Sequence, residues 1–216
     1  AGGFHYAVTP NPEFLLAAKH NPAFRQALLG GDLVLADGVG VVYSAKILGR
    51  PLKGRVPGIE FAAALMARMA GKGKRLFLLG AKPGVAELAA ANLAVEYPGL
   101  VVCGTHDGYF QEDAPVAETI RRARADVVFV CLGAPKQEMW IARNGADTGA
   151  RLLVGLGGSL DVFAGQVKRA PKAFQKLGLE WFYRLLKQPS RIGRMMKLPK
   201  FLLIVIKERL FGRKGK

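Results

Sequence analysis

The sequence lacks the signature motifs of several large enzyme classes. No G-x-x-x-x-G-K-[ST] motif is present, which argues against a P-loop NTPase, and the segment GLGGSLD fails the G-x-G-x-x-G pattern of dinucleotide-binding loops. No G-x-S-x-G elbow is present, which argues against an acyl-transfer triad. There is also no D-x-D motif, and the three histidines are scattered without metal-ligand spacing. We therefore expect neither a metal ion nor a cofactor.

Acidic residues are scarce in the last part of the chain. Residues 168–216 carry 15 Lys and Arg against two acids, Glu180 and Glu208, whereas residues 1–167 carry 17 against 14. The same segment holds several aromatic residues and the apolar run FLLIVI. Cations interleaved with apolar residues are typical of a surface that binds anionic phosphates over hydrocarbon. We predict a body, residues 1–167, that carries the chemistry, and an appendage, residues 168–216, that places it on an anionic membrane.

Long hydrophobic runs and cysteines are also rare. The apolar run of the appendage has six residues, and roughly 20 are needed to span a bilayer. We therefore expect a protein that lies on a membrane and does not cross it. The two cysteines, Cys103 and Cys131, lie in strand-like runs. Their setting predicts buried thiols in a reducing cytoplasm rather than a disulfide.

Six short β-rich runs recur along the body, and most are separated by segments of helical composition. The helical segments include the residues after Pro83-Gly84, residues 114–125, and the segment opened by Pro135. This alternation predicts an α/β fold with a largely parallel sheet and helices on both faces. Ligands of such sheets bind beyond the carboxyl ends of the strands. The runs are HYAVTPN, DLVLADG, RLFLLGAKPG, LVVCGT, DVVFVCLGAPK and RLLVGLGG.

Several carboxylates follow these strands. Asp37 in LADGVG comes directly after an apolar run and could take a proton from an attacking hydroxyl. The local pattern fits equally well an aspartate that caps the following helix. Spacing alone does not separate Asp37 from the other carboxylates of the strand-end loops, which are Asp107, Glu138 and Asp161.

Polar and glycine residues at the same loops suggest a sugar phosphate. Thr9 and Asn11 could bind a sugar, although a helix cap before Pro12 is the favoured interpretation. Glycines at strand ends allow backbone N–H groups to approach phosphate oxygens. These glycines are Gly80, Gly84, Gly133, Gly157 and Gly158.

The appendage itself is expected to form two or three helices. A 3-4-3 spacing predicts one cationic stripe that Pro189 interrupts. The stripe consists of Arg184, Lys187, Arg191 and Arg194.

Six motifs together resemble a known family. The blocks and their order along the chain resemble those of the WecG/TagA/CpsF glycosyltransferases, and the resemblance covers essentially the whole chain. The blocks are TPNPEFL, LADGVGVVYSAKILG with RVPG, FLLGAKPG, HDGYF, CLGAPKQEMW and GLGGSLDVFAGQVKRAP. The resemblance implies a Rossmann-like fold. It also implies an inverting, metal-independent transfer of an N-acetylmannosamine-type sugar from UDP to undecaprenyl-diphosphate-linked N-acetylglucosamine. The resemblance places this reaction at the cytoplasmic face of the cell membrane, in wall teichoic acid or related glycan synthesis. Family members usually have a further strand and helix before TPN, which suggests a missing start here.

The resemblance also implies roles for individual residues. Asp37 matches the general base, and Thr9 lies beside it in the sugar pocket. The positions implied to hold the UDP-sugar are Tyr109, Gln137 and Asp161. Basic residues of an appendage that closes over the active site match Arg184, Arg191 and Arg194.

Two other classes of protein remain as alternatives. A nucleic-acid-binding α/β module would explain the pI near 10.2, but no RNA- or DNA-reading motif is present, and we expect no nucleic-acid partner. A non-catalytic membrane scaffold would explain the appendage but not the polar strand-end loops. A homo-oligomer that dissociates on the membrane is a further expectation.

Overall fold

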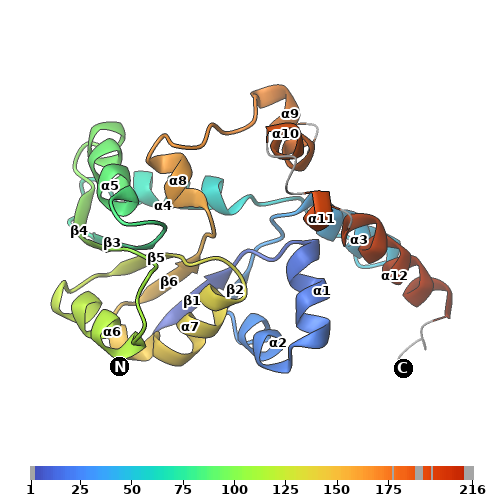
Figure 1. Cartoon of the computed structure of the whole chain (residues 1–216), viewed down its shortest axis with the longest axis horizontal. Helices are drawn as coiled ribbons and strands as arrows, with labels where there is room; N and C mark the ends of the chain where they lie inside the picture. Colours follow the sequence, from blue (N-terminus) through green and yellow to red (C-terminus); the bar gives the residue numbers. More distant parts are fainter. Residues whose placement is uncertain (1–2, 177, 188–191, 196, 212–216) are drawn as a thin grey trace.

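The protein is built around one parallel sheet, as the sequence predicts. The computed structural model describes residues 3–176, 178–187, 192–195 and 197–211. Its six strands are all parallel and lie in the order β2-β1-β6-β5-β3-β4 (Figure 1). The α/β prediction is therefore confirmed. The strands are β1 His5–Val8, β2 Leu33–Val34, β3 Arg75–Gly80, β4 Val101–His106, β5 Val127–Cys131 and β6 Leu152–Gly155.

Helices cover both faces of the sheet, which makes three layers (Figure 1). One face is covered by α4 Gly58–Met69, α5 Val85–Glu96 and α8 Ser159–Phe163. The other face is covered by α1 Pro12–His20, α2 Pro22–Leu29, α6 Asp113–Arg122 and α7 Lys136–Asn144. A short 3-10 helix, Ala146–Thr148, follows α7. The remaining body helix, α3 Val39–Ile47, follows β2.

The alternation of side chains along the central strands produces this double core. In β3, Leu76 and Leu78 join the core under α4 and α5, whereas Phe77 and Leu79 join the core under α6 and α7. A strand buried on both faces needs successive apolar residues, and Leu76–Leu79 supplies them. The two cysteines are free: Cys131 is buried and Cys103 is half-buried. Since β3 separates their strands, the prediction of two thiols is confirmed.

The strand order creates a switch point between β3 and β5. The chain leaves β3 toward β4, at one edge of the sheet, and leaves β5 toward β6, on the opposite side. Loops that depart in opposite directions leave a crevice at the carboxyl ends of the two strands, where ligands of open α/β sheets bind.

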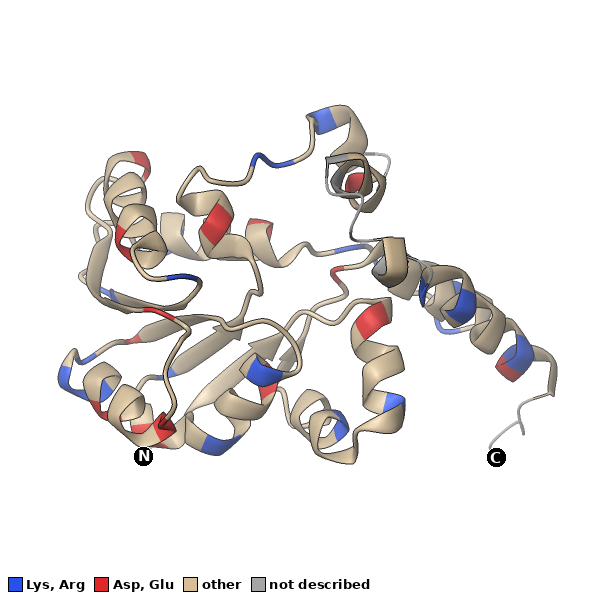
Figure 2. Cartoon of the chain, in the orientation of Figure 1, with Lys and Arg blue, Asp and Glu red and all other residues tan. Residues whose placement is uncertain are grey.

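The C-terminal residues form a helical appendage beside the body. Helix α12 packs against α1 and α3, and a side chain added at Gly40 of α3 would meet Leu198 of α12. Lys and Arg residues lie along α12 (Figure 2). The described part of the appendage is helical, as predicted, and its segments are α9 Lys172–Lys176, α10 Glu180–Lys187, α11 Ile192–Met195 and α12 Lys197–Phe211. None of the described helices is long and apolar enough to cross a membrane.

The predicted cationic stripe can be located only in part. The structure describes the backbone of Arg184 and Lys187 in α10 and of Arg194 in α11, but not their side chains. Arg191 and Pro189 lie outside the described residues altogether.

Candidate functional site

A cavity of about 290 Å³ opens at the switch point between β3 and β5. It brings together two of the predicted substrate-binding residues, Tyr109 from the loop after β4 and Asp161 from the first turn of α8. Lys82, in the turn after β3, lines the same cavity and carries a positive charge into it. The complete lining is Ala81, Lys82, Gly108, Tyr109, Cys131, Leu132 and Asp161.

Lys82 was not among the predicted site residues, although the sequence carries a signal for it. Lys82 lies in the block GAKPG, two residues after the end of β3 and three before α5 begins. A cation between a strand end and a helix N-terminus is well placed to meet a phosphate group. The turn is shaped by close packing, because a side chain on Gly80 would collide with the Cys131 carbonyl oxygen.

The block HDGYF forms a tight turn on the other side of this cavity. The backbone N–H of Tyr109 donates to Asp107 Oδ1 at 2.7 Å, and the N–H of Gly108 donates to the Ala81 carbonyl at 2.9 Å. Asp107 therefore orders the turn that presents Tyr109, which is 70% exposed. Asp107, one of the carboxylates considered beside Asp37, therefore has a structural role in this turn.

Gln137 joins two glycine loops from beneath. Its side chain is fully buried, and Oε1 accepts hydrogen bonds from the N–H of Gly133 at 3.2 Å and of Gly157 at 2.9 Å. These loops follow β5 and β6 respectively. Gln137 thus fixes the spacing of two strand-end loops, while its own atoms are closed off from solvent. Its role in holding the UDP-sugar stays a prediction.

Glu138 is a buried carboxyl beside Gln137. Its Oε1 accepts a hydrogen bond from Gln137 Nε2 at 2.6 Å, and its Oε2 is buried without a hydrogen-bond partner among the described residues. Burial raises the pKa of the Glu138 carboxyl to about 7, and the Gln137 hydrogen bond only partly offsets this effect. Glu138 is therefore largely protonated below neutral pH.

This raised pKa predicts a pH-dependent stability. Between about pH 4.5 and pH 7 the folded state holds a proton that the unfolded state has lost, so stability should fall as pH rises through this window. Glu138→Gln, which mimics the protonated form, should remove this slope. Urea unfolding at pH 5 and pH 8 should therefore show that wild type loses about 3 kcal/mol more than the variant. Parallel losses in the two proteins would show that Glu138 titrates normally.

Thr9 and Asn11 follow β1 and have local structural roles. The Thr9 side chain is buried, and its hydroxyl donates to the Gly155 carbonyl at 2.9 Å, which ties β1 to β6. The Asn11 carboxamide oxygen accepts from the N–H groups of Glu13 and Phe14 and caps α1. The favoured cap interpretation is confirmed for Asn11. The proposed sugar contacts of both residues stay predictions.

Asp37 lies at the end of the loop after β2, next to β1. Its backbone N–H donates to the Pro10 carbonyl at 3.2 Å, so the TPN loop and the Asp37 loop lie side by side. The side chain is half-buried. The N-cap of α3 is Gly38, so Asp37 directly precedes the N-cap position. Two strand ends thus bring Asp37, Thr9 and Asn11 into one neighbourhood.

A second cavity, of about 350 Å³, opens where the body meets the appendage. It is lined by Arg55, Pro57, Glu60, Lys172 and Gln175. The N-terminus of α4 connects it with Thr9, since a Cβ added at Gly58 would lie 3.0 Å from Thr9 Cγ2. Among the described residues no group of three or more His, Cys, Asp or Glu side chains is arranged to hold a metal ion.

Comparisons with known proteins agree with the motifs. The model of the glycosyl transferase WecG/TagA/CpsF family matches residues 1–215. A Bacillus spizizenii protein is 40% identical over 202 residues, which cover 94% of this chain and 79% of the relative. A Bacillus subtilis protein is 40% identical over 200 residues (93% and 78%), and a Staphylococcus aureus protein is 37% identical over 212 residues (98% and 83%). All three are named N-acetylglucosaminyldiphosphoundecaprenol N-acetyl-beta-D-mannosaminyltransferase.

These matches favour the enzyme over the nucleic-acid module and the non-catalytic scaffold. A family model that covers nearly every residue, together with relatives at this identity, shows that the chain belongs to the WecG/TagA/CpsF family of glycosyltransferases.

Proposed function

We propose that the protein transfers N-acetylmannosamine, or a related hexose, from a UDP-sugar to undecaprenyl-diphosphate-linked N-acetylglucosamine. The reaction is inverting and metal-independent, takes place at the cytoplasmic face of the membrane, and serves wall teichoic acid or related glycan synthesis. The observation that carries this proposal is the shared name of relatives that are 37–40% identical over at least 93% of the chain.

The donor would occupy the cavity at the β3/β5 switch point. Its diphosphate would meet Lys82 and the N-terminus of α5, where a positive side chain and the helix dipole both favour negative charge. Tyr109 and Asp161 offer an exposed aromatic ring and a carboxylate to the nucleoside and its ribose hydroxyls. Gln137 would act from below by fixing the two glycine loops.

Asp37 would act as the general base in a single displacement. The acceptor hydroxyl oxygen attacks the anomeric carbon from the face opposite UDP and forms the new glycosidic bond. The carboxylate of Asp37 accepts the hydroxyl proton, and the bond to the UDP oxygen breaks. Negative charge then develops on the diphosphate. Arginines suit its stabilisation because a guanidinium pairs with phosphate oxygens through two parallel hydrogen bonds.

The appendage would hold the enzyme against the lipid that carries the acceptor. On α12, Leu203, Ile206 and Leu210 follow a 3-4 spacing and are exposed, so they form one apolar face. The exposed cations of the same helix are Lys197, Lys200, Lys207 and Arg209. An apolar face with flanking cations fits an interface of anionic lipid headgroups over hydrocarbon.

A donor screen tests the proposed reaction. Purified enzyme would be incubated with a short-chain lipid diphosphate N-acetylglucosamine acceptor and a panel of UDP-sugars, and products would be identified by mass. We expect UDP-N-acetylmannosamine to give a product one N-acetylhexosamine heavier than the acceptor. Product from other donors only, or from none, would refute the assigned substrate.

Activity should also survive removal of divalent metal. The proposed reaction places the diphosphate on basic side chains and a helix N-terminus, so excess EDTA should leave the rate within about a factor of two of the untreated rate. The measurement is the initial rate with and without chelator, with added Mg²⁺ or Mn²⁺ as the control. Full loss with EDTA that either metal restores would contradict a metal-independent mechanism.

A further inference from the structure

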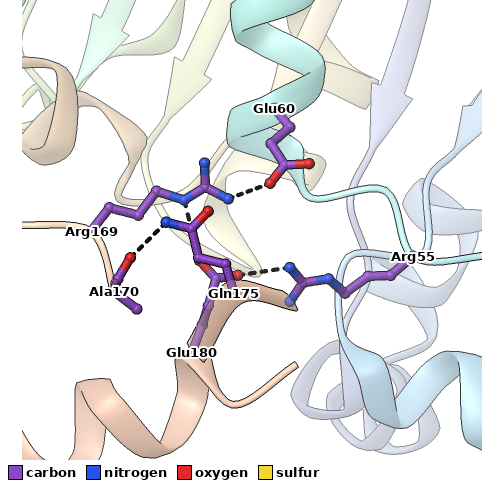
Figure 3. A network of polar contacts seen from close by, with 6 residues as sticks. All are labelled: Arg55, Glu60, Arg169, Ala170, Gln175 and Glu180. Carbon is purple, nitrogen blue, oxygen red and sulfur yellow. Dashed lines mark hydrogen bonds and ion pairs between the residues drawn. The ribbon is translucent and has the colours of Figure 1, made fainter. Parts of the chain in front are cut away.

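Four charged side chains connect the appendage to the body (Figure 3). Glu180, the first residue of α10, receives Arg55 Nη2 on Oε2 at 2.9 Å and Arg169 Nε on Oε1 at 3.2 Å. Arg169 also contacts Glu60 of α4 through Nη2. We call this set, Arg55, Glu60, Arg169 and Glu180, the α10 latch. Three of its four side chains are largely shielded from water, with exposures of 14% for Glu180, 19% for Arg55 and 24% for Arg169.

Glu180 is the central member of the latch. Its two carboxylate oxygens bind guanidinium groups from two different segments, residue 55 before α4 and residue 169 before α9. Charge-assisted hydrogen bonds of this kind are stronger than neutral ones, and partial burial reduces their screening by salt. Glu180 also lies in the first turn of α10, where the helix dipole favours a negative charge.

The position of Glu180 is informative because the appendage has few acidic residues. Residues 168–216 have 15 basic residues and two acids, and one of those two acids is the residue that bridges to the body. The other, Glu208, is exposed on α12. The scarce negative charge is therefore placed where it fixes α10 against two arginines.

The latch holds the segment next to the proposed catalytic loop. The N–H of Val56 donates to the Ala36 carbonyl at 2.9 Å, so the residue after Arg55 pairs with the residue before Asp37. On the appendage side, the backbone of Arg184 lies in the same helix, about one turn after Glu180. The ion pair between Arg55 and Glu180 therefore sets the position of the Arg184 backbone relative to the Asp37 loop.

We propose that Glu180 is a positioning residue, which fixes the basic helix α10 over the Asp37 side of the active site through Arg55 and Arg169. This inference rests on the proposed function for its catalytic consequence, but not for the latch itself. Glu180 touches no reacting atom in this scheme. It determines where the cations of α10 stand when charge develops on the leaving diphosphate.

The test compares Glu180→Gln with Glu208→Gln in the full-length protein, using a soluble acceptor analogue that removes any need for a membrane. The two variants change the charge of the appendage equally, but only the first breaks the latch. We expect Glu180→Gln to lower kcat by 10-fold or more with UDP affinity within about 3-fold of wild type, since the donor cavity of the body is untouched. Glu208→Gln should keep the wild-type rate, and Glu180→Asp should recover part of the loss.

Hydrogen–deuterium exchange gives a readout that does not depend on activity. Exchange across residues 180–187 should rise in Glu180→Gln and, to a smaller extent, in Arg169→Gln, while exchange in the central strands stays unchanged. Unchanged exchange in α10 would overturn the latch. Faster exchange with an unchanged kcat would overturn the positioning role. If wild type transfers no sugar at all, the proposed function fails, and the exchange result still decides whether the latch holds α10.

Discussion

Replacing Asp37 by Asn should lower turnover by roughly 10² or more, the usual scale for loss of a general base. The carboxamide keeps the size of the side chain and its hydrogen-bonding oxygen, but it cannot accept the proton of the acceptor hydroxyl. Since Asp37 follows β2 while the donor cavity lies between β3 and β5, UDP affinity should stay within a few-fold of wild type. Steady-state rates with the lipid acceptor and calorimetric titration with UDP measure the two effects separately.

Asp161→Asn provides the matched comparison for Asp37. Asp161 lines the donor cavity, so its change should weaken UDP-sugar binding and raise KM more than it lowers kcat. Near-normal turnover in Asp37→Asn would end its assignment as the base. A large loss of kcat in Asp161→Asn with an unchanged KM would move the assignment to Asp161, the competing carboxylate inside the cavity.

The core of the fold was predictable because local sequence dictates it. β3 and β5 are buried on both faces, so their apolar runs identify them without knowledge of their neighbours. β2 is less well marked: it forms only Leu33–Val34, and both side chains are exposed because the strand lies at the edge of the sheet. In the appendage, Pro189 lies outside the described residues, whereas a glycine that the sequence did not single out separates two helices. Gly178, with φ of 69°, lies between α9 and α10.

The sequence placed several candidate residues in strand-end loops, but it could not show which of them share a cavity or which partners they have. Tyr109 and Asp161 are far apart in sequence and meet in one cavity because their loops follow strands and helices around the same switch point. The burial of Gln137 could not be foreseen, because it depends on two loops from different strands that close over it. The ion pairs of the latch around Glu180 could not be foreseen from the sequence either. Arg55 and Glu180 are separated by more than half of the chain, and no local pattern in the sequence pairs them.

Alanine at Arg184, Arg191 or Arg194 should lower turnover even on a soluble acceptor. If the appendage only anchored the enzyme, an acceptor that needs no membrane would make these arginines dispensable. If they stabilise the charge that develops on the UDP diphosphate, each single change should cost about 10–10³-fold in kcat. Removal of residue 184 and everything beyond it should abolish both turnover and liposome binding. The measurements are initial rates with a short-chain acceptor and co-sedimentation with anionic liposomes.

Lysines of α12 provide the matched control for these arginines. Lys200→Ala and Lys207→Ala remove exposed cations from the same appendage, and should reduce liposome binding by about 1 kcal/mol each. Added salt should weaken that binding because it screens exposed charges. Their rates on the soluble acceptor should match wild type. Equal rates in the arginine and lysine variants would reduce the appendage to an anchor. Stabilisation of the leaving diphosphate would then be assigned to Lys82 and the N-terminus of α5, because both are positive groups of the body at the β3/β5 switch point.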